Sequence, residues 1–263
     1  MIIDFHTHAF PDVVAKKAIP MLSKKSGNMQ PFTDGTAKGL IDRMDENGVD
    51  VCVVLNIATN PKQMQKVNDF AIAVNSDRLV AFGSVHPDAP DALDELCRIK
   101  EAGLKGIKLH PDYQDFFVDE ERMFPIYEKA AQLNLITVFH AGVDIGWFEP
   151  VHCTPQRLAK ALPHFNGGVV VAAHMGGYML WDDVEKHLVG KDVYFDTGFC
   201  YSRMPVLQAK RIVKNHGADK ILLGSDLPWS PTEREVDFVK AFDLQKEDEE
   251  KILFENAKRL LKI

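Results

Sequence analysis

The feature that most constrains the fold of this chain is a repeat of short apolar runs rich in β-branched residues. These runs occupy residues 2–8, 49–56, 79–87, 106–111, 135–142, 169–177, 193–199 and 220–228. From the second run onward they start at residues 49, 79, 106, 135, 167, 193 and 220, with the sixth counted from Gly167, and successive starts are 26 to 32 residues apart. That spacing suits one strand plus one helix, and runs that are apolar on both faces are typical of buried parallel strands. The sequence therefore predicts eight strand–helix units.

Eight parallel strands can form a closed barrel or an open doubly wound sheet. We expect an α/β fold, a (β/α)8 TIM barrel, because no GxGxxG motif follows the first strand and polar residues end nearly every strand. Barrels of about 250 residues form one domain, so residues 1–263 are predicted to be a single domain. Apolar residues spaced through 252–261 predict an amphipathic C-terminal helix, with the charged run 246–251 on its solvated side.

The connection after the first strand is longer than the others. The first two strands start 47 residues apart, at residues 2 and 49, and the surplus falls at residues 10–35. Because Pro11, Pro20, Gly27, Pro31 and Gly35 interrupt this segment, we expect irregular backbone there that serves as an active-site flap. A second long connection spans residues 143–154.

Composition excludes several classes of partner. The net charge is −7 and no run of basic residues is present, so the chain lacks the positive surface that nucleic acids require. No apolar stretch reaches the roughly 20 residues that cross a bilayer, and strand-like residues follow Met1 where a signal peptide would need a basic and then an apolar region. We therefore expect a cytoplasmic protein with a small-molecule substrate and neither a nucleic-acid nor a membrane partner.

Histidines gather at the ends of the predicted strands. Six of the ten lie there, together with two aspartates: His6, His8, His86, His110, His140, His174, Asp196 and Asp226. In a barrel the carboxyl ends of all strands meet at one mouth, where catalytic side chains are found. The histidine positions therefore predict a site at that mouth.

The His6-Thr7-His8 segment is the sharpest local signal for a metal. Residues i and i+2 of a strand point the same way with Cα atoms about 6.6 to 6.8 Å apart, so two imidazoles can reach one ion. The segment alone is weak evidence, but His140 and Asp226 at other strand ends strengthen it. Imidazole and carboxylate ligands together suit Zn²⁺ best, with Mn²⁺ or Fe²⁺ as alternatives.

Five segments taken in chain order resemble the amidohydrolase superfamily. They are Ile3-Asp4-Phe5-His6-Thr7-His8, Gly106-Ile107-Lys108-Leu109-His110-Pro111, Phe139-His140-Ala141-Gly142, Ala173-His174-Met175-Gly176-Gly177 and Gly224-Ser225-Asp226-Leu227-Pro228-Trp229. The resemblance is strongest to the amidohydrolase-related branch that includes aminocarboxymuconate semialdehyde decarboxylase, and it extends from Asp4 to Leu260. It implies a metal-dependent TIM-barrel enzyme, and a homodimer rests on the resemblance alone.

The resemblance also implies roles for individual residues. His6, His8, His140 and Asp226 would ligate one divalent metal, and His174 would be a catalytic histidine. A metal with an open position lowers the pKa of a bound water to about 7. Asp226 would then carry a proton, and His174 would stabilise an oxyanion or transfer a proton. A second metal held by carboxylated Lys108 is disfavoured, because a barrel lysine paired with Asp4 or Asp196 is simpler.

Further residues near the strand ends are candidates for contacting substrate. His110 and His86 are either substrate contacts or ordinary structural histidines, and Asp196 either orients a ligand histidine or caps its strand. Aromatic and basic candidates in the loops are Phe10, Trp147, Phe148, Tyr178, Trp181, Tyr201, Arg203 and Trp229. We single out Arg203 as a carboxylate anchor because a guanidinium pairs bidentately with carboxylates, although a surface arginine is the competing interpretation.

Three functions stay open at this point. The first is a metal-dependent hydrolase that attacks a small amide, lactone or ester with an activated water. The second is a non-oxidative decarboxylase of a small aromatic or unsaturated carboxylic acid. The third is a non-catalytic barrel that binds metal or ligand, which intact site motifs disfavour. No sequence feature separates the first two.

Overall fold

The computed structural model describes residues 1–147 and 149–263, and each predicted apolar run contains a strand. The strands are β1 (Ile3–Thr7), β2 (Val51–Leu55), β3 (Leu79–Phe82), β4 (Gly106–Leu109), β5 (Ile136–Phe139), β6 (Val170–Ala172), β7 (Tyr194–Asp196) and β8 (Ile221–Leu222). They are shorter than the apolar runs, so most of the predicted strand-end histidines lie in the loops just beyond. The eight-unit prediction is confirmed.

The strands close into a barrel. Parallel pairing links β1, β2 and β3 in one run and β4 to β8 in another. A parallel bridge joins Gly83 to Ile107 between β3 and β4, and another joins Thr7 to Leu227 beyond β8. Between β1 and β8, Phe5 N donates to Leu223 O at 2.7 Å. The predicted TIM barrel is therefore confirmed.

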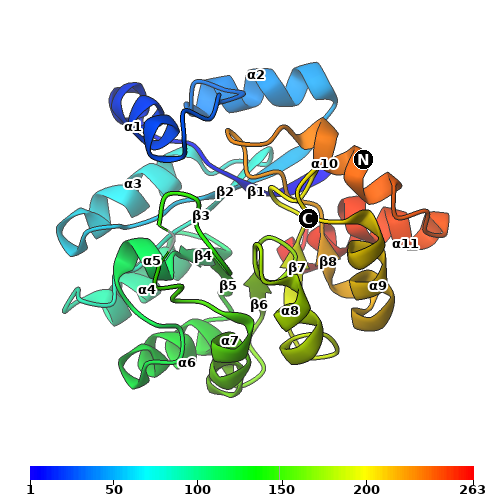
Figure 1. Cartoon of the computed structure of the whole chain (residues 1–263). Helices are drawn as coiled ribbons and strands as arrows, with labels where there is room; N and C mark the ends of the chain where they lie inside the picture. Colours follow the sequence, from blue (N-terminus) through cyan, green and yellow to red (C-terminus); the bar gives the residue numbers. More distant parts are fainter. Residues whose placement is uncertain (148) are drawn as a thin grey trace.

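Helices surround the strands (Figure 1). The α-helices are α1 (Asp12–Lys25), α2 (Ala37–Asn47), α3 (Met64–Val74), α4 (Ala92–Glu101), α5 (Pro111–Gln114), α6 (Phe124–Gln132), α7 (Pro155–Ala161), α8 (Trp181–His187), α9 (Val206–His216), α10 (Thr232–Lys240), α11 (Lys246–Glu250) and α12 (Asn256–Leu261). Short 3-10 turns lie at η1 (Pro61–Gln63), η2 (Glu121–Met123), η3 (Leu162–Phe165) and η4 (Ala218–Lys220), and η5 (Lys251–Glu255) is a π turn joining α11 to α12. Among the described residues, no helix combines the length and apolar character needed to cross a membrane.

The C-terminal helical segment packs against the inside of the barrel. Inward-facing side chains such as Val53, Phe82 and Val138 form one buried cluster, and Ala257 and Leu261 belong to the same cluster. Leu223 N also donates to Ile252 O at 2.9 Å. The predicted amphipathic helix therefore exists, and its apolar side closes the end of the barrel opposite the mouth.

A bulge in β1 turns its side chains toward the site. Ile3 and Asp4 pair with consecutive residues of β2, but the register shifts between Asp4 and Thr7. Phe5 lies inside the barrel, in edge contact with Phe82 at 5.8 Å between ring centroids, and His6 lines the pocket at the mouth. Bulges change which face a residue occupies and often accompany active sites. This one brings Phe5 and His6 to the interior in succession.

The inserted segment differs from its prediction. We expected irregular backbone over 10–35, but residues 12–25 form helix α1 with Pro20 inside it. A proline removes one helical hydrogen bond, and here Ala15, Ala18 and Ile19 are buried against the rest of the protein and stabilise the helix. The segment does reach the mouth, because Phe10, Leu22 and Lys25 line the pocket there.

Candidate active site

One pocket opens at the carboxyl ends of the strands. Its space, counted out to the open mouth, is about 800 Å³, which suits a small-molecule ligand. Five of the predicted residues line its floor: His6, His8, His140, His174 and Asp226. Its walls come from α1, from the loops after β4 and β5, and from Trp229 after β8.

Unusual backbone places two of the floor residues. His174 has a φ of 60° and Asp226 a φ of 72°, both in the left-handed region that non-glycine residues seldom occupy. These conformations end the strand pairing early and turn the side chains into the pocket. Asp226 N donates to His6 O at 2.7 Å, which fixes the turn against β1.

Hydrogen bonds determine the tautomers of the two β1 histidines. His6 Nδ1 lies 2.9 Å from a carboxylate oxygen of Asp196, and His8 Nδ1 lies 2.8 Å from Leu55 O. Both partners accept, so both Nδ1 atoms carry the proton and both Nε2 atoms keep a lone pair. These Nε2 atoms face Asp226 Oδ1 at 3.4 Å and 3.1 Å. Acceptor atoms this close favour a cation between them, so the residues fit a metal ion.

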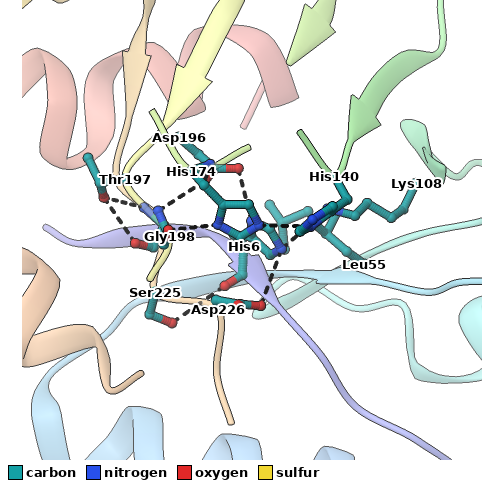
Figure 2. Close-up of polar contacts among 12 residues, drawn as sticks. His6, Leu55, Lys108, His140, His174, Asp196, Thr197, Gly198, Ser225 and Asp226 are labelled. Atoms are coloured by element: carbon teal, nitrogen blue, oxygen red, sulfur yellow. Dashed lines mark hydrogen bonds and ion pairs between the residues drawn. The ribbon is translucent and has the colours of Figure 1, made fainter. Parts of the chain in front are cut away.

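His140 is oriented by a second chain of hydrogen bonds (Figure 2). His174 Nδ1 donates to Gly198 O at 2.8 Å, so His174 Nε2 accepts from His140 Nδ1 at 3.1 Å. His140 Nε2 is then an unprotonated atom, buried and without a hydrogen-bond partner among the described residues. An imidazole held this way is prepared as a metal ligand. The predicted fourth ligand therefore has a free lone pair, while His174 is the residue that positions it.

The protonation states also suit a metal. Burial, with a contribution from the charge of Lys108, lowers the pKa of His6 to about 4, and burial holds the pKa of His140 well below its usual value. Burial alone would raise the pKa of Asp226, but the adjacent His6 and His8 outweigh it and lower that pKa to about 2. At neutral pH the imidazoles of His6 and His140 are therefore neutral and the Asp226 carboxylate is ionised, which are the forms that bind metal.

Lys108 lies beside the ligand cluster. It is 1% exposed, and its Nζ is 3.3 Å from His6 Nε2. Burial lowers its pKa to about 8, against the opposing pull of Asp196 and Asp226. The expected ion pair with Asp4 or Asp196 is not found among the described contacts, because Asp4 accepts from Thr232 Oγ1 at 2.6 Å and Asp196 pairs with His6.

A second group, His110, His140 and Asp144, also brings possible ligand atoms together. The His110 and His140 rings are stacked with centroids 4.2 Å apart and planes only 5° apart. Imidazole lone pairs lie in the ring plane, so two parallel rings do not converge on one ion. His110 Nδ1 instead accepts from Tyr113 N at 3.4 Å. We interpret this group as a stack that supports His140.

Four of the ten residues predicted as candidates for contacting substrate line the pocket, namely Phe10, His110, Tyr178 and Trp229. Trp147 is 39% exposed near the rim. His86 Nδ1 accepts from Asp88 N at 3.2 Å, which matches the structural alternative. These last two are not among the described residues that line the pocket.

The predicted carboxylate anchor packs against a residue of the pocket wall. The Arg203 guanidinium stacks on Phe199, 3.7 Å from its ring centroid, and donates to Tyr201 O at 3.3 Å. Phe199 lines the pocket, whereas Arg203 and Tyr201 do not belong to the described lining. The geometry therefore does not support direct substrate contact for either residue. Phe148 lies outside the described residues.

Among the lining residues that the sequence analysis did not single out are Lys25, Tyr113 and Asp144. Tyr113 OH donates to Asp144 Oδ1 at 3.1 Å, and Asp144 Oδ2 lies 3.5 Å from His110 Nε2. Tyr113 and Asp144 follow the strand-end histidines His110 and His140 by three and four residues, which was the available signal. Lys25 belongs to the inserted segment.

Solved structures of similar fold share nearly the full length of the chain. One is 5-carboxyvanillate decarboxylase from Sphingomonas paucimobilis, with TM-score 0.74, 16% identity, and coverage of 100% of this chain and 99% of that one. A dihydroxybenzoic acid decarboxylase from Polaromonas sp., solved with manganese and 2-nitroresorcinol, has TM-score 0.69, 15% identity, and coverage of 99% and 96%. A probable 2-pyrone-4,6-dicarboxylic acid hydrolase from Acinetobacter baumannii has TM-score 0.68, 19% identity, and coverage of 100% and 99%.

A search of curated protein sequences found no match. The family model described as amidohydrolase matches residues 3–263, which include every strand and every ligand of the candidate metal cluster. The family resemblance noted in the sequence is thereby confirmed. The chain belongs to the amidohydrolase family.

Proposed function

We propose that this enzyme is a metal-dependent, non-oxidative decarboxylase of a small aromatic or unsaturated carboxylic acid. The observation that carries the proposal is the combination of a buried cation and an aromatic wall. Lys108 lies at the floor beside His6, and Phe10, Tyr178, Phe199 and Trp229 line the walls. A planar acid would find ring faces for its body and positive charge for its carboxylate.

The cluster of His6, His8, His140 and Asp226 is the site we propose for the metal. A divalent ion there would supply positive charge for the anionic oxygens of the substrate. We retain Zn²⁺ as the expected ion, with Mn²⁺ and Fe²⁺ as the alternatives. The manganese in the Polaromonas decarboxylase makes Mn²⁺ the stronger of these two.

The chain's residues then have to manage one proton. In decarboxylation the bond between the substrate carbon and its carboxylate breaks, CO₂ leaves, and the electron pair of that bond stays on the carbon. A proton then binds to this carbon in place of the carboxylate. Since the low pKa of Asp226 leaves it ionised at neutral pH, Asp226 must first accept a proton from the substrate or a water before delivering it to carbon. We propose Asp226 for this transfer and His174 for holding His140 and the nearby oxygens in place.

The names of the compared proteins support this choice over hydrolysis. Two of the three reported structures carry names of aromatic acid decarboxylases, and one carries the name of a hydrolase. Hydrolysis of a small amide, lactone or ester is the second candidate, because the same cluster would equally activate a water. A neutral substrate of that kind would leave the buried Lys108 without a counter-charge from the ligand.

The test is elemental analysis of the purified protein followed by one substrate panel. The panel contains amides, lactones and aromatic or unsaturated carboxylates, and each reaction is scored for both hydrolysis and CO₂ release. We expect about one divalent metal per chain and CO₂ release from an aromatic acid. Hydrolysis of a lactone or amide without CO₂ release from any acid would favour the second candidate, and full activity in verified metal-free protein would refute both.

A further inference from the structure

The mouth of the pocket holds a second cation, which comes from the inserted segment. Lys25 lies in the last turn of α1, the blue helix at the upper left of Figure 1, and lines the pocket. Its Nζ lies 4.6 Å from the centroid of the Tyr113 ring and 5.3 Å from that of the Trp147 ring. Lys25 therefore connects α1 to the loops after β4 and β5.

Lys25 is held in place without being neutralised. Surface lysines such as Lys38 and Lys210 pair with carboxylates, but Lys25 forms no ion pair within the part of the chain that the structure describes. Contact with an aromatic face attracts an ammonium through the ring quadrupole and leaves N–H donors for another acceptor. The side chain is also exposed at the rim, so an incoming anion can reach it.

Asp144, an acidic side chain of the pocket wall, is already engaged. Asp144 Oδ1 accepts from Tyr113 OH at 3.1 Å and from Gly146 N at 2.7 Å, and Oδ2 faces His110 at 3.5 Å. Its acceptor atoms are thus directed toward its own loop and toward α5. The positive charge of Lys25 is left for a ligand.

The two cations lie at different depths of one pocket. Lys108 is buried at the floor beside His6, and Lys25 is exposed at the rim. Most of the remaining wall is apolar or aromatic, including Leu22, Ile57 and Phe199. A ligand that contacts the cation at the floor, the apolar wall and the cation at the rim has an anionic group at each end of an apolar body.

We propose that the substrate is a dianion whose second anionic group, remote from the reacting carboxylate, binds to Lys25 at the mouth. This rests on the proposed decarboxylase function and narrows its substrate class to planar acids with two negative groups. Lys25 is then a residue that determines substrate specificity, and α1 is the element that positions it at the mouth of the pocket.

The test measures binding, which does not require turnover. Benzoate, isophthalate and terephthalate are titrated calorimetrically into metal-loaded wild type, Lys25→Met, Lys25→Arg and Lys24→Met. Methionine keeps the length and apolar stem of lysine, and Lys24 is an exposed neighbour outside the described lining, so Lys24→Met controls for net charge. We expect at least one dicarboxylate to bind wild type about tenfold more tightly than benzoate, a difference of about 1.4 kcal/mol.

Lys25→Met should remove the tenfold preference for the dicarboxylate and change benzoate binding by less than about twofold. Lys25→Arg should retain the preference, and Lys24→Met should leave it unchanged. The proposal is overturned if neither dicarboxylate binds wild type more tightly than benzoate. It is also overturned if Lys25→Met weakens the binding of benzoate and dicarboxylates equally, if it weakens the binding of neither, or if Lys24→Met also removes the preference for dicarboxylates. Failure of the decarboxylase function appears separately, as absence of CO₂ release from every acid, and does not alter the binding result.

Discussion

The two ends of this barrel differ in what they bury: apolar side chains at the closed end and polar side chains at the mouth. At the closed end, Ala257 and Leu261 pack among strand side chains such as Phe5 and Val53 in a fully apolar cluster. At the mouth, buried polar groups gather instead, and His140 Nε2 has no partner within the described residues. Left-handed backbone also occurs at the mouth, at His174 and Asp226. Apolar packing is therefore concentrated at the closed end, while the mouth holds polar and strained groups of the kind that cluster at functional sites.

The largest expected effect tests the mouth. Asp226→Asn keeps the size of the side chain but removes the negative charge that faces His6 and His8. We expect kcat/KM for the acid that the wild type turns over to fall about 10³-fold or more, because a proton carrier and a metal ligand are both lost. Circular dichroism and the unfolding midpoint should show an intact fold. Unchanged turnover would refute the proposed role of Asp226.

The next effect tests the closed end. Leu261 is fully buried among the strand side chains, so Leu261→Ala should lower the free energy of unfolding by about 2 to 5 kcal/mol. Turnover by the folded variant should stay within about twofold of wild type, because the pocket is at the other end. Denaturant titration and steady-state kinetics measure the two quantities, with Lys258→Ala as an exposed control on the same helix. A large loss of turnover in folded protein would show that the two ends are coupled.

A smaller effect is expected for the residue that orients His6. Asp196 accepts from His6 Nδ1 at 2.9 Å and from His174 N at 3.0 Å. Asn at this position presents an NH₂ group that favours a proton on His6 Nε2, the atom that faces Asp226. We expect metal affinity to fall about 10-fold to 100-fold. Competition with a chelating dye measures it.

Asp192→Asn is the matched control for that experiment, because Asp192 lies four residues earlier and pairs with Lys220 at the surface. It should leave metal affinity unchanged. Equal metal affinity in Asp196→Asn and wild type would contradict the orienting role.

The fold was largely predictable from the sequence because local pattern determines it. Apolar runs at a regular period mark the strands, and a glycine, Gly217, ends α9. The meeting of the four candidate ligands in one pocket was predictable for a related reason, since His6, His8, His140 and Asp226 all follow or end strands that meet at one mouth. In these cases the topology alone brings distant residues together.

The remainder depends on contacts that no local pattern encodes. Helix α1 forms despite Pro20 because its apolar side is buried by residues far away in the sequence. Arg203 was chosen as an anchor by its position in the sequence, which could not show that its guanidinium stacks on Phe199. Lys25 lies at the mouth of the pocket because its side chain contacts the ring of Tyr113, which is 88 positions later in the chain. The direction of a side chain in a loop therefore depends on tertiary contacts, which the local sequence does not determine.

The smallest expected effect concerns a histidine that supports the fold away from the mouth. His216 Nδ1 accepts from Gly190 N at 3.0 Å and its Nε2 donates to Val193 O at 2.8 Å, so both nitrogens are used in the neutral form. Burial lowers the pKa of His216 in the folded protein. The unfolded chain therefore takes up a proton at higher pH than the folded protein, so this contribution to stability is present above about pH 6.5 and is lost as the pH falls below it.

His216→Gln should consequently lose less stability than wild type between pH 7.5 and 5.5. The difference should be at most about 1.4 kcal/mol, because the unfolded histidine gains its proton within about one pH unit of this range, and unfolding midpoints of metal-free protein at the two pH values measure it. The exposed residue Lys214 on the same helix provides the control, because Lys214→Gln should keep the pH dependence of wild type. If His216→Gln shows the same pH dependence as wild type, this histidine does not contribute to the acid sensitivity of the fold.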